Sequence, residues 1–128
     1  MPAYFKIDKQ RRLVISTMDG VFSLADGLAH QEKLLKDPDF APSFRQLLDC
    51  THVAKLELKP EEMRTLARRA VFSSESRRAI LVRSDLAFGL GRMFLIFREI
   101  QGEKGVRVFR DRDEAVHWLF DEKSADGN

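Results

Sequence analysis

Apolar and polar positions change their spacing several times along this 128-residue chain. Short stretches rich in β-branched and aromatic residues predict strands at 4–8, 12–18, 45–50, 78–82 and 106–109. The polar residues 9–11 predict a turn that pairs the first two strands as an antiparallel hairpin, and Asp19-Gly20 marks the expected end of the second strand. The short, apolar fourth strand is typical of a parallel strand buried on both faces.

Segments with a helical period lie between the later strands. Ser23 is a favourable N-cap for the first helix, whose apolar face is expected to carry Leu24, Leu28 and Leu35, with Leu34 beside them. The second helix begins at Pro60, a favoured first position. Its apolar stripe has helical spacing and consists of Met63, Leu66, Ala67, Ala70 and Val71. A third helix is expected over about 85–101, and Asp111 caps a fourth that carries Ala115, Trp118 and Leu119.

The predicted order of elements is ββαβαβαβα. Strands that alternate with helices imply a largely parallel sheet with right-handed crossovers. We therefore expect an α/β fold: a five-stranded, mostly parallel sheet with an antiparallel N-terminal hairpin and four helices. The chain length is usual for one domain, expected at 1–120, and 121–128 reads as a flexible tail.

Charge and cysteine content narrow the function classes. Lysine and arginine number 22 against 20 acidic residues, a near-balance that argues against nucleic acid as the main partner. A single cysteine excludes an intramolecular disulfide and suits a cytoplasmic protein. The longest apolar stretch, 86–97, is interrupted by Arg92 and is too short to span a membrane. The three histidines and the cysteine show no zinc-ligand spacing, so we expect no metal and no cofactor.

Several local phrases carry a family resemblance. They are Arg-Leu-Val at 12–14, Leu-Asp at 48–49, Leu-Lys-Pro-Glu-Glu at 58–62, Asp-Leu-Ala-Phe-Gly-Leu-Gly-Arg-Met at 85–93, and Val-Phe-Arg-Asp at 108–111 leading to Glu-Ala-Val-His-Trp-Leu at 114–119. In this order they resemble the SpoIIAA-like family, which is related to STAS domains (sulfate transporter and anti-sigma factor antagonist). The resemblance covers residues 4–119 and implies a non-enzymatic α/β module.

STAS regulators carry a phosphorylatable serine at the start of the helix after the third sheet strand. The corresponding stretch here, 51–60, contains no Asp-Ser pair, and Thr51 is its one hydroxyl residue. That mechanism is therefore not carried over to a residue of this chain. The fold is also similar to lipid-transfer domains of the CRAL-TRIO type, which implies a small hydrophobic ligand by analogy.

Four reactive residue types meet at the end of the third predicted strand: Asp49, Cys50, Thr51 and His52. Ligands of open α/β sheets bind at the carboxyl ends of strands. If the strand continues, Cys50 and His52 project to one side, and Asp49 and Thr51 to the other. One hypothesis is a small enzyme that uses Cys50 and His52. The alternative that we favour is a buried cysteine beside a loop histidine.

Arginines are concentrated between Arg64 and Arg83, with six of them against one acid, Glu75. Arg64 and Arg68 share a helix face because they are four residues apart. Since the apolar stripe faces inward, we expect both arginines to face solvent. They could recognise a phosphate, a carboxylate or an acidic partner, or they could simply form a solvated face.

The expected helix at 85–101 is apolar almost all round, with Arg92 on its narrow polar side. Phe88, Leu95 and Ile96 lie away from the face best suited to the sheet. Internal packing, a second subunit or an apolar ligand could bury them. We predict a homodimer through this helix. The sequence thus favours a non-catalytic regulatory or binding module of STAS type. It would bind a small hydrophobic or anionic ligand or a protein partner at a surface that includes Phe88, Arg92, Leu95, Ile96, Arg64 and Arg68.

Overall fold

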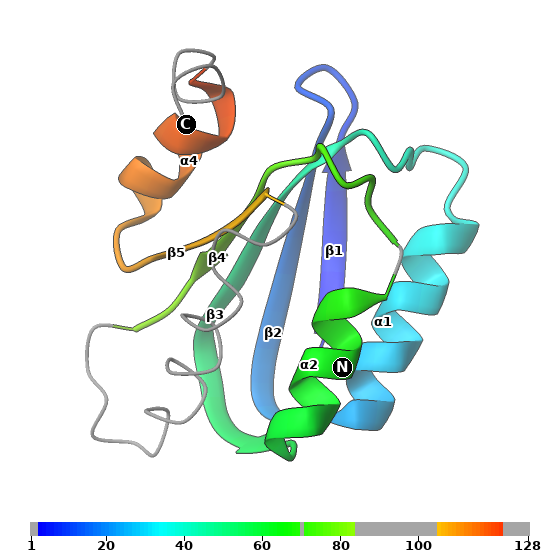
Figure 1. Cartoon of the computed structure of the whole chain (residues 1–128), viewed down its shortest axis with the longest axis vertical. Coiled ribbons are helices and arrows are strands. Elements are labelled where there is room, and N and C mark those ends of the chain that lie inside the picture. Colours follow the sequence, from blue (N-terminus) through cyan, green and yellow to red (C-terminus); the bar gives the residue numbers. More distant parts are fainter. Residues whose placement is uncertain (1–2, 70, 84–104, 122–128) are drawn as a thin grey trace.

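A computed structural model describes residues 3–69, 71–83 and 105–121 (Figure 1). Its elements are β1 (Ala3–Asp8), β2 (Leu13–Ser23), α1 (Leu24–Lys36), β3 (Arg45–Glu57), α2 (Pro60–Arg68), β4 (Arg78–Leu81), β5 (Val106–Phe109) and α4 (Arg112–Phe120). All five predicted strands and three of the four predicted helices are therefore present. The helix expected at 85–101, with Phe88, Arg92, Leu95 and Ile96, lies outside the described residues, as do residues 122–128 of the expected tail.

The sheet has the simple order β1-β2-β3-β4-β5. The pair β1–β2 is antiparallel, and the three pairs that follow are parallel, so the α/β fold with an N-terminal hairpin is confirmed. The hairpin turn is fixed by Asp8, whose carboxylate accepts hydrogen bonds from the backbone N–H and the Nε of Arg11 at 3.1 and 2.8 Å. In the part of the chain that the structure describes, no helix is long and apolar enough to cross a membrane.

Strands β2 and β3 are longer than the sequence predicted. The expected end of β2 at Asp19 and Gly20 is wrong, because the pairing continues to Ser23 after two register shifts. Gly20 has a φ of +57°, a conformation that glycine adopts without steric cost, and it lets the strand bend and continue as a β-bulge. Strand β3 likewise runs beyond Cys50 to Glu57, paired with β2 along this extension.

The helices cover the two faces of the sheet unequally. Helices α1 and α2 lie side by side on one face, and α4 lies on the other (Figure 1). The three predicted helix starts are confirmed by their caps. Ser23 and Asp26 form a reciprocal capping box, Pro60 is the first residue of α2, and the Asp111 side chain accepts from the backbone N–H groups of Asp113 and Glu114.

Close packing characterises the α4 face. Leu13, Leu47, Ala79 and Leu81 of three strands pack against Ala115 and Leu119 of α4. Two arginines of the same face hold the end of that helix. Arg45 Nε donates to the Leu119 carbonyl at 2.6 Å, and Arg77 donates to the carbonyls of Trp118 and Asp121. These guanidinium groups satisfy carbonyls that a helix C-terminus leaves without partners.

The opposite face departs from the predicted helix stripes. The buried residues of α1 are Gly27, His30 and Leu34, whereas Leu35, expected to be inside, is 45% exposed. The reason is the close approach of α2: a Cβ on Gly27 would lie only 2.6 Å from Leu66 Cδ1. Gly27 therefore lies where α1 meets α2, and the buried face of α1 is rotated away from its leucine-rich side.

Helix α2 also ends earlier than expected. It stops at Arg68, and Arg69 has an extended backbone conformation. Met63 is buried as the stripe predicted, but Val71 enters the core from the segment after the helix and packs near Leu34 and Phe44. The prediction that Val71 continues the helical stripe is therefore wrong, although its burial is correct.

Candidate functional site

A cavity of about 120 Å³ lies between the sheet and the layer formed by α1 and α2. Most of its lining is apolar and comes from four strands and both helices. Representative lining residues are Met18, Phe22, Val53, Met63, Leu66 and Ile80. Space of this kind loses dispersion contacts and is unusual in a close-packed interior. An apolar molecule could recover those contacts, so the cavity is the leading candidate for a binding site.

Polar side chains from two strands and α1 also line the cavity. Gln46 of β3 and Arg78 of β4 are direct neighbours in the parallel pair, and both are close to the amino ends of their strands. The Gln46 Nε2 donates to Ser16 Oγ at 3.0 Å. Above the sheet, α1 contributes His30 and Gln31, and Gln31 Nε2 donates to the Leu66 carbonyl at 2.8 Å. Gln46 and Arg78 therefore give the cavity a polar part near the amino ends of β3 and β4, and α1 adds two further polar groups.

Three buried polar atoms of this group have no hydrogen-bond partner within the described part of the chain. They are His30 Nε2, Gln31 Oε1 and Arg78 Nε. His30 itself is only 5% exposed. Buried polar atoms are nearly always hydrogen-bonded, because an unmet hydrogen bond costs free energy. Three such atoms along one cavity indicate a site that is completed by something that enters it.

Burial also governs the charges at this site. It lowers the pKa of His30 to about 4, with a smaller contribution from Lys33, so the imidazole is neutral near pH 7. Burial lowers the pKa of Arg78 as well, but a guanidinium remains protonated at physiological pH. Its carbon lies 5.7 Å from the centre of the Phe72 ring. Within residues 3–69, 71–83 and 105–121, none of the ion pairs includes Arg78.

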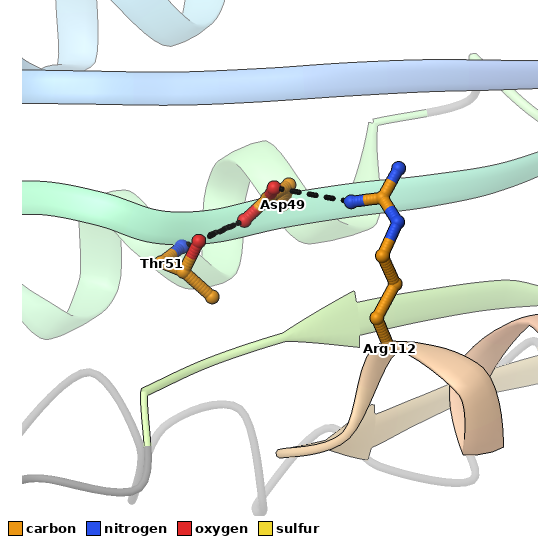
Figure 2. Close-up of polar contacts among 3 residues, drawn as sticks. All are labelled: Asp49, Thr51 and Arg112. Carbon is orange, nitrogen blue, oxygen red and sulfur yellow. Dashed lines mark hydrogen bonds and ion pairs between the residues drawn. The ribbon is translucent and has the colours of Figure 1, made fainter.

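A second polar cluster lies on the α4 face, near the middle of β3 (Figure 2). Asp49 Oδ1 accepts from the backbone N–H and the hydroxyl of Thr51 at 2.9 and 2.6 Å. Asp49 Oδ2 pairs with Arg112 NH1 at 3.4 Å, which ties the first turn of α4 to β3. Both carboxylate oxygens are thus engaged within the chain. This cluster places α4 on the sheet, and the prediction that Asp49 and Thr51 share a side is confirmed.

Cys50 is buried and His52 is exposed, an arrangement that does not favour a catalytic pair. Cys50 is 3% exposed, in a core cluster with Val53, and burial raises the pKa of its thiol to about 12. His52 is exposed. The prediction that both project to one side assumed regular alternation, and the register shift opposite Thr17 and Asp19 breaks it. A thiol this resistant to ionisation is a poor nucleophile.

The arginine concentration is divided among several roles. Arg64 and Arg68, with Glu61, Thr65 and Arg69, line a shallow groove on α2. Arg68 is exposed as predicted, but Arg64 is half-buried. Arg69 pairs with Glu32 of α1 at 3.4 Å. Arg77 and Arg78 lie on opposite faces of the sheet, so the six arginines do not form one anion-binding surface.

Sequence reasoning missed the polar part of the cavity. The sequence does hold a signal: on α1, His30 and Gln31 lie between Gly27 and Leu34 and therefore share the side that the helix buries. On the strands, Gln46 and Arg78 stand immediately before apolar core positions. Polar residues at inward positions of otherwise apolar elements mark such sites. Among the described residues, no group of three or more histidines, cysteines or acidic residues could hold a metal ion.

Similarity to a solved structure extends over most of this chain. That structure is the crystal structure, at 2.25 Å resolution, of an uncharacterized protein of the DUF3478 family from Shewanella loihica PV-4, which has a SpoIIAA-like fold. The similarity covers 91% of this chain and 93% of that protein, with a TM-score of 0.57 and 19% sequence identity. No protein-family model and no curated protein matches the chain. Strand order, helix placement and this similarity together show that the chain has a SpoIIAA-like fold, as the sequence phrases predicted.

Proposed function

We propose that this protein is a non-catalytic binding module of STAS type, and that a small, largely hydrophobic ligand occupies the cavity under α1 and α2. The observation that carries the proposal is the cavity itself, an apolar space of about 120 Å³ with three buried polar atoms that lack partners. A folded chain does not gain stability from such a space. Its maintenance is better explained by a ligand than by the fold.

Binding is favoured over catalysis by the state of the reactive groups. The thiol of Cys50 is buried and has a raised pKa, and the carboxylate of Asp49 is fully engaged by Thr51 and Arg112. The alternative, an enzyme based on Cys50 and His52, requires a thiol that reacts in the folded state. We expect a thiol reagent to modify Cys50 only after denaturant is added. Rapid modification of the native protein would instead support the hypothesis of an enzyme.

The direct test is binding of a neutral apolar probe, 1-hexanol, followed by NMR titration of the full chain. We expect saturable shifts at residues that line the cavity. Ala67 of α2 lines the cavity, and Ala54 of β3 is exposed. Ala67→Phe should fill the space and weaken binding at least about tenfold, whereas Ala54→Phe should leave it unchanged. Equal binding by both variants would place the probe elsewhere, and no saturable binding to the wild type would refute the proposal.

The homodimer and a regulatory protein partner remain proposals that rest on the sequence. The dimer was inferred from the apolar residues of 85–101, which lie outside the described residues. Sedimentation velocity at micromolar concentration tests it, and a single monomer species that is unaffected by Leu95→Glu would refute it.

A further inference from the structure

We propose that the ligand of this cavity is a small amphipathic carboxylic acid, with its carboxylate against Arg78 and His30 and its apolar body between the sheet and α2. This inference rests on the proposed function, because it names the chemical class of the ligand. It is carried by the separation of the cavity wall into a polar part and an apolar part, and by Arg78, a cation in the polar part for which the described residues supply no counter-ion.

Arg78 contributes a positive charge to the lining of the cavity. Its Nε is buried without a partner, and no ion pair in the described ranges includes it. Arg78 is half-buried, and a charge with reduced access to water is favoured by an ion pair, so an anion beside this guanidinium would be stabilised. A carboxylate supplies two acceptor oxygens in the planar geometry that a guanidinium prefers. The neighbouring strand residue, Gln46, is occupied by Ser16 and does not supply this anion.

The described groups that line the cavity include two arginines and one histidine. His30 lines the same cavity and is 5% exposed, with Nε2 unpartnered. Its pKa of about 4 makes it neutral near pH 7, so it offers a hydrogen bond and no charge. The other lining arginine, Arg69, is already paired with Glu32. One unpaired cation matches a monoanion such as a carboxylate better than a phosphate, which carries more than one charge near pH 7. Gln31 Oε1 is an acceptor and would take a water or a ligand hydroxyl.

The polar and apolar parts of the cavity wall follow one another along β3 and β4. Gln46 and Arg78 stand at the amino ends of β3 and β4, and the same strands place Cys50, Val53 and Ile80 further along. Apolar side chains of α2, including Met63 and Leu66, cover this further part. A ligand with its carboxylate at the amino ends and its apolar part toward the carboxyl ends therefore meets complementary groups along its length.

The volume of the cavity limits the size of the ligand. A cavity of about 150 Å³ in another protein holds benzene. The cavity here, of about 120 Å³, is slightly smaller. It therefore accommodates an apolar body of about six carbons rather than a long acyl chain. Hexanoate is a suitable probe, and 1-hexanol matches it in chain length but lacks the charge.

The experiment compares hexanoate and 1-hexanol by NMR titration against the full chain near pH 7. We expect hexanoate to bind at least about tenfold more tightly than the alcohol, because only hexanoate can form an ion pair with the guanidinium of Arg78. Arg78→Met should remove this preference, so that the two probes bind with similar affinity. Arg107 of β5 is exposed and lies on the α4 face, over Trp118, so Arg107→Met is the matched control and should keep the preference.

Further measurements separate the failure of this inference from the failure of the proposed function. If 1-hexanol binds in the cavity as tightly as hexanoate, or if Arg78→Met keeps the preference, the cavity is a binding site but its ligand is not an acid held by Arg78. If neither probe binds, both proposals fail. Arg78→Lys, which retains the charge, should keep part of the preference and shows that any loss in Arg78→Met is not misfolding. Saturating hexanoate should also raise the pKa of His30, observed through its imidazole carbons, and an unchanged value would contradict the assigned contact.

Discussion

Arg77 and Arg78 are consecutive residues that serve the two faces of the sheet in opposite ways. On the α4 face, Arg77 donates to the carbonyls of Trp118 and Asp121 and lies over the Trp118 ring. On the face covered by α1 and α2, Arg78 lines a cavity and its Nε has no partner. All of the buried, unpartnered side-chain atoms in the described ranges lie on this second face.

This contrast separates what the fold needs from what a ligand needs. The α4 face is packed, and its arginines and its Asp49 are satisfied within the chain, so its polar groups contribute to stability. The cavity face contains open space and unmet hydrogen bonds, both of which reduce stability. A feature that destabilises the folded chain and also has the chemistry of a binding site is a functional candidate.

The largest expected effect on stability is in leucine truncation. Leu119 on α4 is fully buried in a packed cluster, and Leu34 on α1 is 1% exposed but borders the cavity. Leu119→Ala should lower the free energy of unfolding by about 3–5 kcal/mol, and Leu34→Ala by about 2–3 kcal/mol, because the cavity side of Leu34 has fewer contacts to lose. Urea denaturation measures both values. A larger loss for Leu34→Ala would mean that the cavity is closed by packing in solution.

The second expected effect concerns acid. The folded pKa of His30 is about 4, below the unfolded value of 6.5. The unfolded chain therefore binds a proton that the folded chain does not, and stability, intact above pH 6.5, declines as pH falls toward 4. This group alone should remove about 2 kcal/mol between about pH 7 and about pH 4.5.

Replacement of His30 by leucine should flatten that part of the pH profile, as measured by urea denaturation at both pH values. The exposed His52 provides the matched control, and His52→Leu should leave the wild-type loss in place. If His30→Leu and the wild type lose the same stability in acid, the imidazole is not desolvated in the folded state.

The elements of the fold differed in how well they could be predicted from the sequence. Strand positions followed from β-branched stretches, and helix starts followed from Ser23, Pro60 and Asp111, because these signals are local. The ends of β2 and β3 did not follow, since a bulge at Gly20 depends on pairing with a distant strand. The buried face of α1 was misassigned for a similar reason: Gly27 lies inside only because Leu66 of another helix meets it.

The candidate site was harder to predict than the fold. Reactive residue types drew attention to Asp49, Cys50 and His52, yet these are a helix anchor, a core thiol and an exposed residue. The polar wall of the cavity instead combines α1, β3 and β4, which are far apart in the sequence. Side chains brought together only by tertiary contacts leave no short motif.

The two adjacent arginines provide a test in which the sign of the effect differs. Arg77→Met removes hydrogen bonds to two carbonyls and a cation–π contact with Trp118, whose ring centre is 5.1 Å away, and should destabilise the protein by about 2 kcal/mol. Arg78→Met removes a half-buried charge that has no ion pair in the described ranges, and it should leave stability unchanged or raise it by up to about 1 kcal/mol. Both are measured by urea denaturation without ligand. Equal destabilisation would show that Arg78 has a partner in the folded chain.

The smallest expected effect concerns the contact that shapes the cavity roof. A Cβ on Gly27 would lie 2.6 Å from Leu66 Cδ1 and 3.3 Å from Phe22 Cζ, so Gly27→Ala must turn the Leu66 side chain. The helix gains about 1 kcal/mol from alanine, and the overpacking costs about 1–3 kcal/mol, so the net loss should be about 1 kcal/mol. The Leu66 side chain can move only into the cavity. The free energy of 1-hexanol binding should therefore fall by more than the free energy of unfolding. In a Leu66→Ala background the clash is gone, and Gly27→Ala should become stabilising by about 1 kcal/mol. If it remains destabilising there, the approach of α1 to α2 is limited by Phe22 or the backbone rather than by Leu66.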